Sequence, residues 1–305
     1  MTTATTGKKI NVVSLQEKWN SYLRHPMALV QFLLVHLAAL LAAMVVLFLI
    51  LYILITGLPH IHKELFAWTW TTKNQSMMPA IINTLVMTLL SLVMAVPAGV
   101  GGAIYMVEYA KRGNKLVKLV RLTSETLQGI PSIVYGIFGF VFFNVALGWG
   151  FSILSGSVTL AIMILPLILR TTEEALMAVP DSYREGSFGL GAGKLRTVFR
   201  IILPAAMPGV LAGIILSIGR IVGESAALIY TAGSGTGNLA FVKNGSFDLF
   251  APLFQSARTL SVHMYCLMNE GLYTDQAHAT AVILMVLVIG LNALSSCAAK
   301  KLTKQ

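Results

Sequence analysis

Long apolar segments separated by charged residues dominate the sequence, and they predict helices that cross a membrane. A helix needs roughly 20 apolar residues to cross the hydrocarbon, because each residue adds about 1.5 Å. The stretch between Glu125 and Arg170 carries no charge and is long enough for two crossings, with a turn at 148–157. We therefore expect an all-α integral membrane protein with six transmembrane helices. The predicted spans lie around 27–58, 77–106, 127–147, 153–169, 201–230 and 277–298.

The composition supports this prediction. Apolar residues make up 56% of the 305 positions and charged residues only 11%, whereas a water-soluble domain has about 25% charged residues. A chain with so few charges cannot be solvated on all sides, so lipid must face much of it. The first apolar stretch is too long for a signal-peptide core and lacks a small-residue cleavage site, so we interpret it as a retained anchor.

The positions of Lys and Arg predict the orientation. Cytoplasmic segments of membrane proteins carry an excess of these residues. With the N-terminus in the cytoplasm, basic residues concentrate in the inner segments 1–26, 107–126, 170–200 and 299–305. The outer segments then hold only Lys63, Lys73, Lys243 and Arg258. We therefore expect both termini to be cytoplasmic. The asymmetry also accounts for most of the net charge of +10, which leaves little reason to expect nucleic-acid binding.

The inner segment 170–204 predicts a short helix of its own. Pro180 ends one helical stretch, since the residue before a proline is biased away from the helix. Ser182 then precedes Glu185 by three residues, the spacing of a capping box, which predicts a helix from Ser182 to Gly189. The glycines at 189, 191 and 193 break that helix.

This segment also carries a motif. Glu185-Gly186-Ser187 is followed by three residues, Gly191, nine residues, Ile201, one residue and Leu203-Pro204. The pattern resembles the EAA signature of the membrane subunits of ABC importers, with Gly186 and Ser187 in place of the two alanines. The resemblance implies a type I permease fold, in which this loop forms the coupling helix that docks on a cytoplasmic ATPase. The implied coupling residues are Ser182, Glu185, Gly186, Ser187, Gly191, Ile201, Leu203 and Pro204.

The sequence gives no reason to expect a nucleotide site or a cofactor in this chain. Gly193-Lys194 matches the end of a P-loop, but Phe188 occupies the position of the first required glycine. Leu195 stands where a Ser or Thr would hold magnesium. We therefore expect a transport subunit that is not an enzyme, with ATP hydrolysis on another chain.

Two charges interrupt the fifth span, Arg220 and Glu224. Their i, i+4 spacing predicts that they share a helix face and can pair. A charge at mid-bilayer costs at least about 2.5–3.5 kcal/mol, so these residues should face each other or a polar pathway. Two interpretations stay open: the pair locks the helix to a neighbour, or Arg220 lines the path and holds an oxyanion while Glu224 fixes its rotamer.

Polar side chains in the second span are a separate expectation. Asn83, Thr84, Thr88 and Ser91 should form hydrogen bonds to neighbouring helices. In the fifth span Gly209, Gly213 and Ser217 are spaced by four, which predicts a small-residue face that packs closely.

Several stretches resemble the permeases of phosphate importers, most of all the PstA type, over about residues 77–298. The resemblance implies a complex with a PstC-like second permease, a PstB-like ATPase dimer and a PstS-like phosphate-binding receptor. It also implies that Arg220 and Glu224 lie on the phosphate path. The stretches that carry it are Gly129–Ile133, Arg170–Glu174, Val179–Ser182, Arg184-Glu185 and Gly219–Glu224.

The predicted organisation has three parts: a tail, first helix and outer loop (1–76), a permease core (77–298) and a short cytoplasmic tail (299–305). Two alternatives remain. One is an ABC importer permease for another oxyanion, such as sulfate or molybdate. The other is a self-contained secondary carrier, which predicts an inverted repeat between the halves; no convincing repeat is present.

Overall fold

The computed structural model describes residues 26–111, 113–239, 242–243, 246–248 and 250–303. The predicted N-terminal tail up to residue 25 lies outside the described residues, as do residues 304 and 305. The chain divides into two units, residues 1–55 and 56–305. Nearly all of helix α2 (Pro26–Gly57) belongs to the first unit, and every other element belongs to the second.

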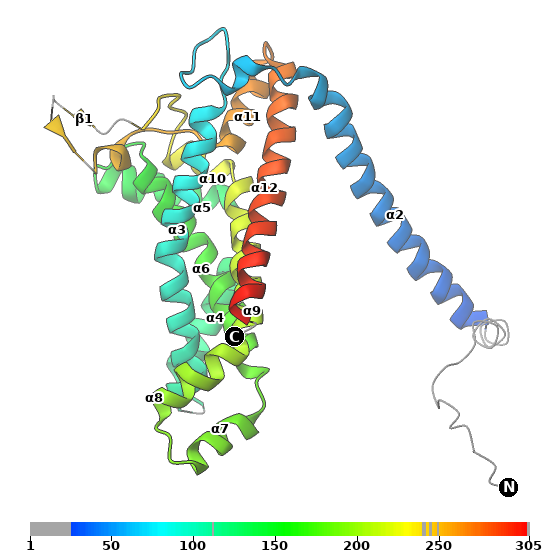
Figure 1. The fold of residues 1–305 in the computed structure, drawn as a ribbon, viewed down its shortest axis with the longest axis vertical. Helices are drawn as coiled ribbons and strands as arrows, with labels where there is room; N and C mark the ends of the chain where they lie inside the picture. Colours follow the sequence, from blue (N-terminus) through cyan, green and yellow to red (C-terminus); the bar gives the residue numbers. More distant parts are fainter. Residues whose placement is uncertain (1–25, 112, 240–241, 244–245, 249, 304–305) are drawn as a thin grey trace. The chain divides into compact units, whose positions relative to one another are not determined.

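The second unit is almost entirely helical (Figure 1). Its only strands in the described residues, β1 and β2, pair antiparallel over two residues each, with Val242 opposite Phe247. Up to the end of α6, the elements are η1 (Leu58–His60), η2 (Lys63–Phe66), α3 (Met78–Ile104), η3 (Tyr105–Tyr109), α4 (Lys115–Gln128), α5 (Ser132–Gly139), η4 (Phe140–Ala146) and α6 (Ile153–Met177). They are followed by α7 (Asp181–Gly189), α8 (Lys194–Thr197), η5 (Val198–Ile202), α9 (Leu203–Gly223), α10 (Ala226–Thr231), β1 (Val242–Lys243), β2 (Ser246–Phe247), η6 (Ala251–Phe254), α11 (Leu260–Glu270) and α12 (Thr274–Thr303).

Five of the described helices are long and apolar enough to cross a membrane, and a sixth crossing is present if one bent pair counts as a span. The bent pair is α4 followed by α5 and η4, whose axes differ by 104°. It replaces the straight third span expected around 127–147. Pro131 has no backbone N–H and disfavours helical geometry at Ile130, which explains why the helix stops there.

Helix α4 also begins earlier than the predicted span. It starts at Lys115, where the Asn114 side chain accepts a hydrogen bond from the Leu116 amide at 2.9 Å. Its first half carries basic residues on an amphipathic helix, in place of the inner loop expected there. Uncharged length alone does not indicate this helix, because basic residues occupy its first half.

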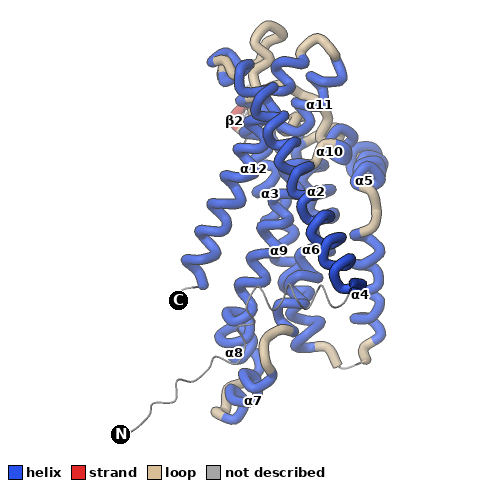
Figure 2. Tube along the Cα trace, turned by 90° about the vertical axis from the view of Figure 1, so that its right-hand side faces the viewer, coloured by secondary structure: helices blue, strands red, loops and turns tan. Residues whose placement is uncertain are grey.

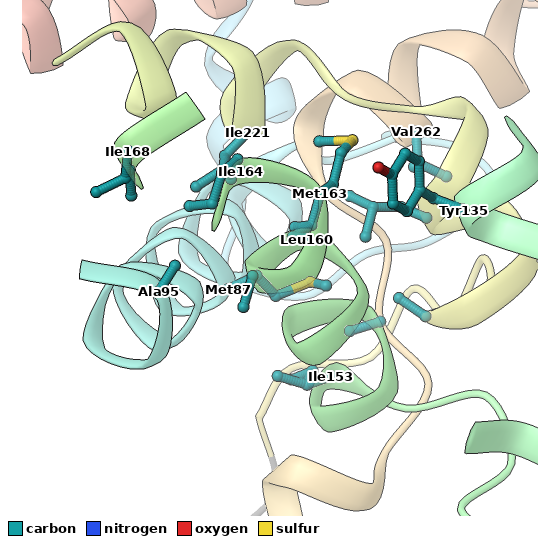
Figure 3. Close-up of a cluster of buried hydrophobic side chains, with 14 residues drawn as sticks. Met87, Ala95, Tyr135, Ile153, Leu160, Met163, Ile164, Ile168, Ile221 and Val262 are labelled. Atoms are coloured by element: carbon teal, nitrogen blue, oxygen red, sulfur yellow. The ribbon is translucent and has the colours of Figure 1, made fainter. Parts of the chain in front are cut away.

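Helix α6 supplies most of the main apolar cluster. Ile153, Leu160, Met163, Ile164 and Ile168 are buried in a cluster that also takes side chains from α3, α5, α9, α10 and α11 (Figure 3). Burial of this apolar surface on several sides makes α6 the helix around which its neighbours pack.

The small-residue face of α9 lies against α6, as predicted. A Cβ atom built at Gly209 would lie 2.6 Å from the Cβ of Ala175, and one at Gly213 would overlap Thr171. Ser217 is fully buried and donates to the Gly213 carbonyl at 2.9 Å. The absence of larger side chains lets the two helices approach closely.

The polar residues of α3 mostly bond to neighbouring segments, as expected. Asn83 donates to the Arg258 carbonyl at 3.3 Å, and Ser91 donates to the Ser157 carbonyl at 3.0 Å. Thr84 accepts from the Leu260 amide at 2.8 Å. The prediction was wrong for Thr88, whose side chain makes its only hydrogen bond within the described residues to the Thr84 carbonyl of its own helix.

The second unit has two distinct ends, which we call the α7 end and the α11 end. Helices α7 and α8 lie at one, while α11, η6 and the β1–β2 pair lie at the other (Figures 1 and 2). The end of η3 reaches the α7 end, because Glu108 forms an ion pair with Arg184 of α7. The segments 107–126 and 170–200, whose basic residues predicted a common side, therefore do share one end of the bundle.

Close contact between α5 and α10 gives a stability prediction. A Cβ built at Gly136 would lie 2.7 Å from the Cα of Ala227, a backbone atom that cannot move aside cheaply. We expect Gly136→Ala to destabilise the folded protein by about 1–3 kcal/mol through overpacking. Gly101→Ala is the control, since nothing lies within 4 Å of a Cβ there, and alanine in a helix should gain up to ~1 kcal/mol. Thermal unfolding in detergent would measure both, and equal melting temperatures for the two variants would contradict the prediction.

Candidate functional site

Helix α7 forms the first candidate site, and it begins one residue earlier than predicted. It starts at Asp181 after Pro180, and no side chain caps its first turn. The predicted capping box between Ser182 and Glu185 is therefore wrong, and Ser182 lies inside the first turn. The Asp181 carboxylate fits there because helix N-termini attract negative charge. The helix ends at Gly189, as expected.

One face of α7 is open. Ser182, Glu185 and Gly186 are exposed, and no atom lies within 4 Å of a Cβ built at Gly186. Apolar side chains surround them: Phe188 is 48% exposed and Leu190 is 91% exposed. An exposed apolar patch around a carboxylate, on a helix with no neighbour on that side, is typical of a surface that contacts another protein.

The opposite face holds α7 to the rest of the unit. Ser187 is buried, and its Oγ lies 2.8 Å from the Oγ1 of Thr197 on α8. Gly191 turns the chain between the two helices with a φ of +79°, a left-handed conformation that glycine adopts at little cost. Of the predicted coupling residues, Ser187 and Gly191 therefore shape the loop, while Ser182, Glu185 and Gly186 form its open surface.

The remaining coupling residues anchor the loop to the bundle. Ile201 and Leu203 are half-buried against a second apolar cluster that includes Leu176, Val198 and Ile202. Pro204 is exposed in the first turn of α9, where a proline is well tolerated.

Two helix breaks form the second candidate site. The first lies between α4 and α5, where the Tyr135 hydroxyl donates to the Leu127 carbonyl at 2.8 Å across the break. The second lies between α9 and α10, where Glu224 has an extended backbone. There the Glu224 Oε1 accepts from the Ala227 amide at 3.1 Å, and the Glu224 carbonyl accepts from Ser261 Oγ at 2.6 Å. Side chains thus satisfy backbone groups that each break frees.

The predicted Arg220–Glu224 pair is not formed. Helix α9 ends at Gly223, so Glu224 no longer shares a helical face with Arg220 and instead caps α10. Within the described residues, Arg220 has neither a hydrogen bond nor an ion pair, although it lies close enough to Tyr135 to interact electrostatically. The half-buried guanidinium is therefore free to hold an anion beside the two breaks.

Charged residues at the α7 end form a network that sequence spacing only partly indicated. Arg121 of α4 pairs with the buried Glu173 of α6, and Arg170 pairs with Glu174 at 3.0 Å. These residues, with Glu125, line a cavity of about 200 Å³. The i, i+4 spacing of Arg170 and Glu174 could be recognised in the sequence, whereas the Arg121–Glu173 pair joins residues 52 positions apart.

Arg258 and His263 form a buried polar pair at the α11 end, which no motif or spacing in the sequence indicated. The Arg258 Nε donates to the Ser234 carbonyl at 3.1 Å, and its Nη1 lies 3.2 Å from the His263 Nδ1. Burial lowers the pKa of Arg258, and burial together with the charge of Arg258 lowers the pKa of His263 to about 4. His263 is therefore neutral at physiological pH.

The described residues contain no group of three His, Cys, Asp or Glu side chains that could hold a metal ion. The first site offers an exposed helical surface on α7. The second offers the guanidinium of Arg220, which has no hydrogen-bond or ion-pair partner among the described residues. Together with the long apolar helices, these features define a multi-pass helical membrane protein with a protruding helix, α7, at one end.

Comparison with known proteins identifies the family. Residues 95–304 match the model for the binding-protein-dependent transport system inner membrane component, and the chain belongs to this family. A probable ABC transporter permease of Bacillus subtilis, YqgI, is 34% identical over 281 residues, covering 87% of this chain and 94% of the relative. The phosphate transport system permease PstA of Mycobacterium leprae is 32% identical over 238 residues, covering 74% of each chain.

Solved structures confirm the fold. A chain of a bacterial alginate ABC transporter has a TM-score of 0.62 at 17% identity, covering 94% of this chain and 98% of that one. A chain of the MetNI methionine ABC transporter in an inward-facing conformation has a TM-score of 0.54 at 22% identity, covering 73% and 94%. The predicted ABC importer permease fold is therefore confirmed, and the chain is a transport component of the membrane.

The buried His263 gives a pH prediction. Between pH 6.5 and about 4 the unfolded chain binds a proton at this position and the folded chain does not. Stability should therefore fall as the pH is lowered through this window, with a total loss of about 3 kcal/mol. Thermal unfolding in detergent at several pH values would measure this loss.

A matched pair of variants isolates the contribution of this histidine. His263→Gln should weaken the pH dependence, whereas His62→Gln, at an exposed position, should leave it as in the wild type. An unchanged pH dependence in His263→Gln would show that another group is responsible.

Proposed function

We propose that this chain forms half of the translocation pathway of an ATP-driven importer of inorganic phosphate. The permease core would span residues 77–298, with both termini in the cytoplasm. The excess of Lys and Arg in the segments that share the α7 end supports this orientation, since basic residues are retained on the cytoplasmic side. A PstC-like second permease would supply the other half of the pathway.

The open face of α7 supports a contact with a cytoplasmic ATPase. It projects from the end of the bundle with Glu185 and Gly186 exposed, and it carries the spacing of the EAA signature. ATP would bind and be hydrolysed by a PstB-like dimer on this surface, since the chain has no P-loop of its own. Closure of the dimer would move α7 and switch the helices between inward- and outward-facing arrangements.

The unpaired Arg220 is the observation that carries the proposed cargo. It lies next to two helix breaks and has no acidic partner among the described residues. Its guanidinium presents a planar set of donors that suits a phosphate oxyanion. The relatives named as phosphate permeases support the same substrate. A PstS-like receptor would deliver phosphate at the α11 end, from which it would pass Arg220 towards the α7 end.

Replacement of Arg220 tests the proposed path. We expect Arg220→Gln to lower phosphate uptake into proteoliposomes by roughly tenfold or more, because a hydrogen bond to a charged group contributes about 1.5–3 kcal/mol. Lys73→Gln is the control: it removes one exposed positive charge at the α11 end and should keep uptake near the wild-type rate. Unchanged uptake by Arg220→Gln at saturating receptor would exclude Arg220 from the path.

The ATPase contact has its own test. No atom lies within 4 Å of a Cβ built at Gly186, so we expect the permease with Gly186→Leu still to insert and fold. We expect the ATPase to be retained on the purified permease roughly tenfold less, equivalent to ~1.4 kcal/mol of binding free energy. Gly237→Leu, a matched change in open space in the segment between α10 and β1, should retain the ATPase fully. Equal retention by both variants would argue against a contact at α7.

The two alternatives predict different transport. A permease for sulfate or molybdate would give uptake of that ion with little competition from phosphate. A self-contained carrier would move its substrate with neither ATPase nor receptor present. Uptake by the reconstituted complex, measured with and without ATP and with each oxyanion as competitor, distinguishes all three.

A further inference from the structure

One arginine joins the contact helix α7 to the membrane helices. The Arg184 Nη2 donates to Glu108 Oε1 at 2.7 Å, and its Nε donates to the same oxygen at 3.1 Å. Glu108 lies on η3, the π-helical continuation of α3. The Glu108 side chain is 7% exposed and that of Arg184 is 16% exposed. This contact, the Arg184–Glu108 bridge, is therefore a mostly buried ion pair between elements 76 residues apart.

The guanidinium of Arg184 uses all of its donors. Besides the two bonds to Glu108, Nη2 donates to the Leu176 carbonyl at 3.0 Å. Nη1 donates to the Val179 carbonyl at 2.9 Å and to Asp181 Oδ1 at 3.1 Å. An arginine has five N–H donors in a fixed planar arrangement, and each has an acceptor here. One side chain thus holds η3, the end of α6 and the start of α7 in a fixed relation.

The bridge borders open space. Glu108 and Arg184 line a cavity of about 470 Å³ together with Met177, Phe188 and Lys194. Apolar packing therefore does not fill the region between α7 and η3. The Arg184–Glu108 bridge joins the two elements at the edge of this cavity. On its other side α7 is held by the Ser187–Thr197 hydroxyl contact to α8.

A buried ion pair is weak evidence for stability alone, because apolar residues of similar size often stabilise a fold as well. A planar guanidinium that makes five hydrogen bonds to four acceptor oxygens does, however, fix a geometry, which apolar packing does less strictly. We propose that the Arg184–Glu108 bridge transmits movement of α7 to α3 and α6, so that Arg184 and Glu108 are positioning residues for energy coupling. This inference rests on the proposed function of α7 as the ATPase contact.

Two conservative variants test the bridge in the complete complex, reconstituted with its second permease, ATPase and receptor. Glu108→Gln keeps the shape of the side chain and removes its charge. Arg184→Lys keeps the charge but loses the planar set of donors. We expect each to lower the phosphate imported per ATP hydrolysed by roughly tenfold, within the usual range of coupling between distant sites. The ATPase should remain bound and active.

Glu174→Gln is the matched control. Glu174 also pairs with an arginine at the α7 end, but its side chain is 59% exposed and its partner Arg170 is 48% exposed. Its removal should leave the ratio of phosphate to ATP unchanged. The reversed pair Glu108→Arg with Arg184→Glu should recover part of the ratio lost in the single variants, because the opposite charges face each other again.

The outcomes separate the bridge from the proposed function. If the Glu108→Gln and Arg184→Lys complexes assemble and import as much phosphate per ATP hydrolysed as the Glu174→Gln control, the proposed role of the bridge in coupling is wrong. A parallel fall of uptake and ATP hydrolysis, or a failure of both variants to assemble, would also overturn it, since each indicates a role in folding alone. If the wild-type complex imports no phosphate on addition of ATP, the proposed function itself fails, whatever the variants do.

Discussion

The structure depends on one constraint: backbone N–H and C=O groups in the hydrocarbon must find partners within the protein. Unbroken helices meet it by themselves, and most of the bundle is built from them. Several hydroxyls of α3, α6 and α9 follow the same rule, since Thr84, Ser91, Thr159 and Ser217 each donate to the carbonyl four residues earlier in their own helix. These four hydroxyls are thereby buried with a partner, whereas the hydroxyls of Ser157 and Thr172 in α6 have none among the described residues.

The two helix breaks are the places where this constraint becomes costly, and both are covered by side chains. Tyr135 bonds to the end of α4, while Glu224 and Ser261 bond to groups exposed by the gap between α9 and α10. The close approach of Gly136 to Ala227 brings the breaks together. Because Glu224 is used as a cap, Arg220 is left without an acidic partner in the part of the chain that the structure describes.

The sequence predicted what depends on local pattern and failed where contacts are distant. The length of the uncharged stretches identified most of the membrane spans. The positions of the basic residues indicated which segments lie at the same end of the bundle. The bend at 129–131 does have a signal in the sequence, Pro131, but this proline lies inside a long apolar segment whose length alone predicts a straight span. Gly223 beside Glu224 is a local signal for the end of α9, because glycine often ends a helix. Regular helical spacing across this glycine gave a false pair with Arg220. The Arg184–Glu108 bridge joins residues far apart in the sequence, which no spacing can indicate.

The distribution of ion pairs explains why Arg220 stands apart. Arg121, Arg170 and Arg184 all have carboxylate partners at the α7 end, where water and counter-charges lower the cost of a charge. Arg220 lies deeper in α9, where that cost is higher and a partner would stabilise the fold most. A permanent carboxylate beside it would, however, compete with an entering anion. A guanidinium without an ion-pair partner among the described residues is costly at this depth. In the proposed function an oxyanion in transit would offset that cost, which would suit a site that binds and then releases its substrate.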